Sequence, residues 1–191
     1  MVSKRILVLK SSPRKNSNSS LLAEQVAAGA VAAGAEVESY ALHGMDIRPC
    51  DACDACQDAT EGVCVIDDDM QLLYPKLRNA DGIVLASPIY WFTMSAQLKV
   101  CIDRWYALAA GEGKPWAGKQ FAILLTYGDV DPLASGAVNA IRTFQDMLRY
   151  MDADLTGMIY CTATDPAEVR GLPEVLAQAY ALGQKLGSAA A

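Results

Sequence analysis

The sequence predicts a single α/β domain, residues 1–191, in which a five-stranded parallel sheet is covered by helices on both faces. Short apolar runs alternate along the chain with stretches whose apolar residues recur every three or four positions. The apolar runs show no clean alternation with polar residues, as expected for strands buried on both faces. The length of 191 residues and the hydrophobic content of 52% suit one core, and no low-complexity linker interrupts the chain.

The order of these elements favours one topology. We expect strands at residues 6–9, 36–42, 83–86, 121–125 and 155–160, and helices at 22–33, 70–77, 95–108, 137–150 and 176–186. The second strand contains Glu36 and Glu38, so it is expected at an edge of the sheet. Right-handed crossovers then favour the order 2-1-3-4-5, the flavodoxin-like three-layer sandwich. A ligand should lie beyond the carboxyl ends of the strands, between the first and third strands.

Composition excludes several classes of function. The formal net charge is −6, and nucleic acids and anionic membranes select basic surfaces, so neither is an expected partner. One histidine, His43, leaves no basis for a Ser-His-Asp triad or a multi-histidine metal site. The first apolar run is too short for a signal peptide, and no run approaches the roughly 20 residues that cross a bilayer. We therefore expect a cytoplasmic protein.

The segment after the first strand suits a phosphate group. Residues 11–20, SSPRKNSNSS, offer hydroxyls, amides and the Arg14 guanidinium directly before a helix. A helix N-terminus adds unpaired N–H groups, and together these donors favour a phosphate monoester. The alternative is a solvated turn with Ser19 or Ser20 as an ordinary N-cap. No G-x-G-x-x-G motif follows the strand, so a dinucleotide-binding Rossmann site is not expected.

An aromatic segment follows the third strand. Residues 87–94, SPIYWFTM, place three aromatic side chains in a row at a strand end, a composition that suits a planar ring ligand. The alternative is an aromatic lid that packs on its own domain or on a neighbouring subunit. The fourth strand ends at Tyr127 and Gly128, where glycine permits a close backbone approach to a ligand.

A cysteine-rich loop at residues 46–66 follows the second strand. Cys50, Cys53, Cys56 and Cys64 have the spacing C-x2-C-x2-C-x7-C, which allows three thiolates to face one [4Fe–4S] cluster while a fourth joins from nearby. Zinc bound by four thiolates and free or partly oxidised thiols are the alternatives. Because the loop follows a strand of the same sheet, we expect it to share one face with the other two loops. The aspartates around it, including residues 67–69, are either solvated or lower the potential of a cluster.

Two segments carry a resemblance to a known family. SSPRKNSNSS and SPIYWFTMSAQLKVCIDRW resemble the two signatures of the flavodoxin-like NAD(P)H-dependent FMN reductases, and the setting of the cysteines is similar to that in the iron–sulfur flavoproteins of that family. The resemblance implies bound FMN. The residues that would bind its phosphate are Ser12, Arg14, Ser17, Asn18 and Ser19. Those that would cradle its ribityl chain and isoalloxazine ring are Pro88, Ile89, Tyr90, Trp91 and Phe92, with Tyr127 and Gly128 along the other edge.

We therefore expect an oxidoreductase in which FMN exchanges electrons with a [4Fe–4S] cluster on Cys50, Cys53, Cys56 and Cys64. The expected partners are NAD(P)H, quinones, free flavins and ferredoxin-like proteins. One alternative is a cluster-free NAD(P)H-dependent FMN or quinone reductase, and another is a non-enzymatic electron carrier or redox sensor. No side chain stands out as a general acid or base. The aromatic residues 90–92 and 105–106, together with the resemblance, predict a homodimer or homotetramer.

Overall fold

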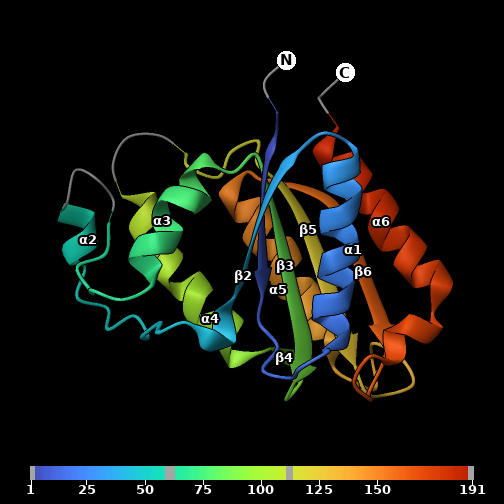
Figure 1. The fold of residues 1–191 in the computed structure, drawn as a ribbon. Helices are drawn as coiled ribbons and strands as arrows, with labels where there is room; N and C mark the ends of the chain where they lie inside the picture. The colour runs from blue at the N-terminus through green and yellow to red at the C-terminus, as the bar shows by residue number, and fades with distance from the viewer. Residues whose placement is uncertain (1–2, 59–62, 111–113, 189–191) are drawn as a thin grey trace.

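The computed structural model describes residues 3–58, 63–110 and 114–188, and these contain a six-stranded sheet. Five of its strands are parallel and lie in the order β2-β1-β3-β5-β6 (Figure 1). The strands are β1 (Arg5–Lys10), β2 (Glu36–Ala41), β3 (Gly82–Tyr90), β4 (Thr93–Met94), β5 (Gln120–Tyr127) and β6 (Asp154–Thr162). The predicted parallel order is confirmed. The prediction of five strands is wrong by one, because the short β4 folds back antiparallel on the end of β3.

Helices cover both faces of the sheet. They are α1 (Asn18–Ala32), α2 (Ala55–Asp58), α3 (Met70–Asn79), α4 (Ala96–Asp103), α5 (Ala137–Met151) and α6 (Pro173–Gly187). Short 3-10 turns form η1 (Leu42–Gly44), η2 (Arg104–Ala109) and η3 (Glu168–Gly171). Figure 1 shows α1 and α6 together on one face, with α3, α4 and α5 on the other. The small helix α2 lies in the cysteine loop, to the side of the sheet.

Side-chain alternation along the strands builds two cores. Ile6 and Val8 of β1 pack with the residues of α1 and α6, whereas Leu7 and Leu9 pack with those of α3, α4 and α5. Both faces of a central strand are buried in this way, which explains why its sequence is a continuous apolar run. β2 has no such run and is largely exposed, in agreement with its predicted place at the edge.

Most elements differ from the predicted ranges by a few residues at their ends, and two of the differences bear on the site. β3 continues to Tyr90, because its pairing with β5 extends to Pro88 opposite Thr126, so residues 87–90 are strand and not loop. The helix predicted over 95–108 is α-helical only to Asp103 and then tightens into η2. Within η2, the Arg104 side chain is buried together with Trp105, Ala107 and Leu108.

Glycines bring α1 and α6 into backbone contact. A Cβ added at Gly29 would lie 2.0 Å from the carbonyl oxygen of Tyr180, and one added at Gly183 would lie 2.0 Å from that of Val26. Neither obstacle is a flexible side chain that could move aside. α1 and α6 can therefore approach this closely only because these two residues have no side chain. α1 also begins at the ligand-binding edge of the sheet, which is described below.

This contact predicts that Gly29→Ala and Gly183→Ala each lower the free energy of unfolding by about 3 kcal/mol, near the upper end of the usual overpacking range. Gly44→Ala is the matched control, because nothing lies within 4 Å of the Cβ that it adds. Urea denaturation measures all three variants. Equal stability of Gly29→Ala and Gly44→Ala would contradict the close packing of α1 on α6.

Candidate functional site

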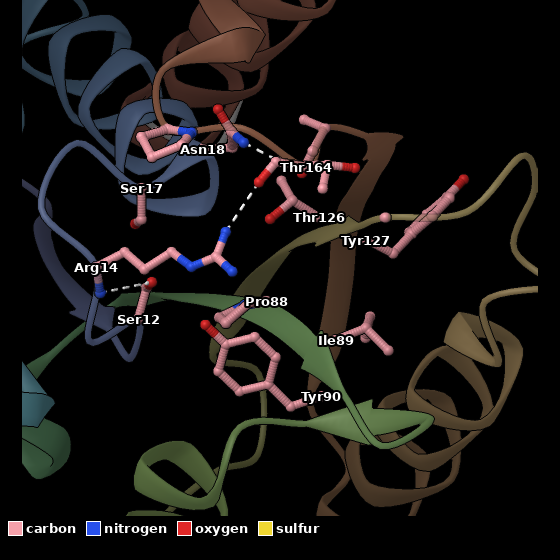
Figure 2. Close-up of a pocket in the computed structure, with 13 residues that line it drawn as sticks. Ser12, Arg14, Ser17, Asn18, Pro88, Ile89, Tyr90, Thr126, Tyr127 and Thr164 are labelled. Carbon is pink, nitrogen blue, oxygen red and sulfur yellow. Dashed lines mark hydrogen bonds between the residues drawn. The ribbon is translucent and has the colours of Figure 1, made fainter.

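A pocket of about 190 Å³ opens at the carboxyl ends of the central strands (Figure 2). The first loop, the end of β3, the end of β5 and the segment after β6 each form part of its wall. It is lined by Ser12, Arg14, Ser17, Asn18, Pro88, Ile89, Tyr90, Thr126, Tyr127, Gly128, Ala163, Thr164 and Pro166. This is the place that the order of the strands predicts for a ligand.

The structure brings most of the predicted binding residues together here, and three lie elsewhere. Ser19 is fully buried in the first turn of α1 and does not line the pocket. Trp91 and Phe92 line an adjoining hollow of about 320 Å³, which shares Ile89, Tyr127 and Gly128 with the first pocket. Because of these shared residues, the two hollows form one continuous depression with a polar end and an aromatic end.

The polar end is built for an anion. Ser17 is the N-cap of α1, and its hydroxyl accepts a hydrogen bond from the N–H of Ser20 at 3.2 Å. The first N–H groups of a helix have no intrahelical partner, and the helix dipole makes this end positive. Arg14 lies across the pocket and donates through Nη1 to the carbonyl oxygen of Thr164 at 2.8 Å, as Figure 2 shows. A phosphate fits these donors. The Ser19 hydroxyl, in the same first turn of α1, is buried without a hydrogen-bond partner among the described residues.

Asn18 joins two walls of the pocket. Its side-chain amide donates to the carbonyl oxygens of Ala163 at 3.1 Å and Asp165 at 2.9 Å, and its Oδ1 accepts from the N–H of Val169 at 3.1 Å. The role of Asn18 in this structure is therefore to hold the segment after β6 against the first loop. The sequence reasoning missed that segment, residues 163–166, although its position after the last strand was a usable signal.

The aromatic end is formed by an unusual hairpin turn. Tyr90 pairs with Thr93, so Trp91 and Phe92 are the two central residues of the turn, and their φ angles are +47° and +67°. Positive φ at both positions is the pattern of type I′ turns, which normally carry Asn-Gly. Gly136 leaves room for the Phe92 ring, because a Cβ at that glycine would lie 2.3 Å from Cδ1 of Phe92. Trp91 is 92% exposed, and its ring meets that of Phe92 edge-on with ring centroids 6.5 Å apart.

Tyr127 lines both the polar pocket and the aromatic hollow. The residue is 7% exposed, and burial is the largest cause of a raised pKa of its phenol. The hydroxyl therefore stays neutral at physiological pH and adds no negative charge that would repel a phosphate. A phosphorylated molecule with a planar ring matches the whole depression.

The cysteine loop lies apart from this depression. Figure 1 shows α2 to the side of the sheet beyond α3, away from β4 and the strand ends. The loop begins at that edge with η1, and none of its described cysteines lines either hollow. The expectation that the cysteines share one face with the ligand loops stays a prediction.

The four thiols are free, and they differ in exposure. Cys50 and Cys53 are exposed, whereas Cys56 and Cys64 are buried. A backbone hydrogen bond from Ala55 lowers the pKa of Cys53, but the hydrogen bond with Asp51, desolvation and the nearby negative charges outweigh it and leave that pKa raised. Four free thiols in one loop suit an iron–sulfur cluster chemically. Within the described parts of the chain, however, no three His, Cys, Asp or Glu side chains are gathered as a metal site.

The acidic run after the cysteines is partly buried. Asp68 forms an ion pair with Arg104, and both side chains have 0% exposure. Burial would raise the pKa of Asp68, but hydrogen bonds from Arg104 and from the N–H groups of Arg48 and Met70 outweigh burial and hold that pKa below its ordinary value. Asp68 is thus neither a solvated residue nor a free negative charge beside the thiols. The sequence reasoning treated Asp68 only as part of the acidic run and assigned no role to Arg104.

Comparison with known proteins identifies the family. The sequence profile of the NADPH-dependent FMN reductases matches residues 4–158. This chain belongs to that family. It is 39% identical to an iron-sulfur flavoprotein of Methanosarcina thermophila, over 52% of this chain and 51% of that protein. A second iron-sulfur flavoprotein, from Archaeoglobus fulgidus, is 34% identical over 73% of this chain and 70% of its own length.

The solved structures support the fold. The NAD(P)H:quinone oxidoreductase from Methanothermobacter marburgensis superposes with a TM-score of 0.77 and 19% identity, over 100% of both chains. The matched region spans about half the length of the first curated relatives. No helix in the described parts of this FMN reductase family member combines the length and apolar character that a membrane span requires.

Proposed function

We propose that this chain is an FMN-dependent oxidoreductase that accepts electrons from NAD(P)H or a protein donor and passes them to a quinone, a flavin or a ferredoxin-like acceptor in the cytoplasm. The continuous depression, polar at the helix N-terminus and aromatic at the β3–β4 turn, carries this proposal. Membership of the FMN reductase family supports it.

The chain's own residues would divide the work of binding. Ser12, Arg14 and Ser17 would bind the phosphate of FMN together with the first N–H groups of α1. Pro88, Ile89 and Tyr90, with Tyr127 and Gly128 opposite, would hold the ribityl chain and the ring between β3 and β5. Trp91 and Phe92 would close the outer side of the ring. FMN, when bound, supplies the electron and hydride transfer, and the protein supplies position and exclusion of water.

The anion site predicts a specific effect of charge reversal. Arg14→Glu should weaken FMN binding about ten- to hundred-fold, which corresponds to the loss of one charged hydrogen bond of about 1.5–3 kcal/mol. Fluorescence titration of the apoprotein with FMN measures the dissociation constant. Arg149→Glu, an exposed substitution of equal charge on α5, should leave the constant unchanged.

The identity of the cofactor is checked independently. Acid release followed by chromatography should yield FMN and not FAD, because one phosphate-binding loop accompanies the pocket. FAD in that extract, or no flavin bound after reconstitution, would overturn the proposed function whatever the Arg14 variant does.

We further propose that Cys50, Cys53, Cys56 and Cys64 hold a [4Fe–4S] cluster that exchanges electrons with FMN. The spacing of the four thiols, their free state and the iron-sulfur flavoprotein relatives support this. A cluster would make transfer of single electrons natural, as a ferredoxin-like partner requires. Burial of Cys56 and Cys64 would shield one side of the cluster from solvent.

Cys53→Ser should remove the iron and leave FMN bound, because the loops of the FMN pocket belong to other strands. Anaerobic reconstitution of the native chain should give about four iron and four sulfide per chain. Cys161→Ser is the control, since Cys161 lies on β6 outside the loop. Iron below stoichiometry in the native chain, or zinc bound stoichiometrically in its place, would exclude the cluster.

The second candidate function is a cluster-free NAD(P)H-dependent FMN or quinone reductase. The observation in its favour is that the described cysteines do not gather into a metal site. Steady turnover of NAD(P)H with a quinone by iron-free protein would favour it. Flavin reduction without turnover would instead favour an electron carrier or redox sensor.

We also propose that the chain forms a homodimer or homotetramer through the rim of the aromatic hollow. Trp91 and Phe92 line it and are 92% and 53% exposed. Val130 and Leu133, 83% and 75% exposed, lie in the segment between Asp129 and Ala134, which both line it. Such a concentration of exposed apolar residues is typical of an interface. Trp105, which the sequence suggested for the same surface, is buried and stacks on Trp116 with ring centroids 4.8 Å apart.

Light scattering at micromolar concentration should give at least twice the chain mass of 20.4 kDa. Leu133→Lys should shift the population toward one chain, because a buried unpaired charge opposes association. Tyr150→Lys is the control. The Tyr150 side chain in α5 is 92% exposed, and its replacement should leave the population of oligomers unchanged. A native chain that scatters as a monomer would refute the oligomer.

A further inference from the structure

The cysteine loop is closed at its neck by hydrogen bonds between its two ends. The N–H of Asp46 donates to the Asp69 carboxylate at 2.7 Å, and the N–H of Asp69 donates to the carbonyl oxygen of Asp46 at 2.9 Å. One step further in, the N–H of Arg48 donates to Asp68 at 3.0 Å. The loop thus leaves and returns at nearly the same point, with Cys50 just after the neck and Cys64 just before it.

Arg104 joins both ends of the loop from outside. Its Nη1 donates to the carbonyl oxygen of Arg48 at 2.8 Å and to the Asp68 carboxylate at 2.5 Å, and its Nη2 donates to the other oxygen of Asp68 at 3.2 Å. One guanidinium therefore forms hydrogen bonds with both segments of the neck, the one that leads into the loop at Arg48 and the one that leaves it at Asp68. Its planar fork suits this geometry, which a single ammonium group would not reproduce.

The element that carries Arg104 is itself fixed to the loop and to α3. The Tyr74 hydroxyl donates to the carbonyl oxygen of Arg104 at 3.2 Å. Gln57, next to Cys56, donates to the carbonyl oxygen of Tyr106 at 3.0 Å. Gln71 of α3 donates to the carbonyl oxygen of Cys64 at 2.7 Å. The neck is thus connected to η2, and the segments beside Cys56 and Cys64 are held to η2 and α3.

The pair is too deeply buried to be explained as a surface contact. Both side chains have 0% exposure, so each ion has lost its hydration. Buried ion pairs contribute little net stability compared with apolar residues of the same volume, but loss of one partner is costly. Such a pair is best suited to fixing one arrangement of the chain, here the closed neck.

We propose that Arg104 is a positioning residue for the cysteine loop, and that with Asp68 it holds the two ends of the loop, which lead to Cys50 and from Cys64, closed at the neck before any iron is bound. The functional part of this inference, that the closed loop prepares the thiols for iron, rests on the proposed cluster. Its structural content, a loop kept closed by one guanidinium, is independent of the cluster.

The test compares Arg104→Met, Asp68→Asn and Arg104→Lys with the native chain. In metal-free protein, iodoacetamide labelling followed by mass spectrometry gives the rate of alkylation of each cysteine. We expect Cys56 and Cys64, which are buried, to react at least tenfold faster in Arg104→Met, and the buried Cys101 to stay slow. Arg104→Lys should restore part of the protection, because it keeps the charge but not the fork.

After anaerobic reconstitution, Arg104→Met should bind less than half of the native iron while its FMN content is unchanged. Lys114→Met breaks the exposed Lys114–Asp152 pair, 2.9 Å long, and is the control that should change neither quantity. If Arg104→Met does not fold, Asp68→Asn, which is nearly isosteric, replaces it in both measurements.

The inference is overturned if Cys56 and Cys64 react in these variants at the same rate as in the native chain and the iron content is also the same. Faster alkylation of Cys101 by the same factor would also overturn it, because the pair would then support the whole fold and not the loop. A native chain that binds no iron refutes the proposed cluster, and the alkylation rates still decide the role of Arg104.

Discussion

The parallel sheet is the constraint on which every part of the candidate site depends. Because all five long strands run the same way, the loops after β1, β3, β5 and β6 emerge at one edge. No one of these loops forms a cavity alone, and the pocket exists only where they meet. Asn18 holds two of these segments together, because its three hydrogen bonds join the first turn of α1 to the segment after β6.

Sequence reasoning placed a segment correctly where its side-chain chemistry and its position after a strand indicated the same role. Hydroxyl-rich and aromatic segments directly after buried strands had to come together at the strand ends, and they do. It was a poor guide where backbone conformation departed from preference. Trp91 and Phe92 adopt positive φ, which bulky side chains rarely do, so no turn signal predicted the hairpin that forms β4. The wall formed by residues 163–166 carries no distinctive chemistry and was missed for that reason.

Arg104 and Asp68 illustrate a different limit of sequence reasoning. They are separated by 36 residues, and each has an ordinary interpretation on its own, the arginine as a helix surface residue and the aspartate as part of a charged run. Periodicity and composition describe one element at a time, so they do not register a contact between two elements. Only the packing of η2 against the neck of the cysteine loop shows that both side chains are buried and paired.

The backbone conformation of the aromatic turn lowers the stability of the fold, so we expect the turn to serve a function. Two non-glycine residues in sparsely populated backbone regions cost on the order of 1–3 kcal/mol each, and such strain persists where the surrounding structure enforces it. Gly136 and Asn139 enforce it here, the glycine by admitting the Phe92 ring and the asparagine by donating to the carbonyl oxygen of Phe92 at 3.3 Å. Asn-Gly in the turn would remove the strain, but it would also remove the aromatic rim.

The aromatic rim follows β3 at the carboxyl edge of the sheet, whereas α2 of the cysteine loop lies to the side of the sheet beyond α3 (Figure 1). A rim that covers the ring of FMN and also binds a second chain would have two roles. That double use gives a physical reason for keeping Trp91 exposed on a strained turn, where burial within one chain would have been the more stable arrangement.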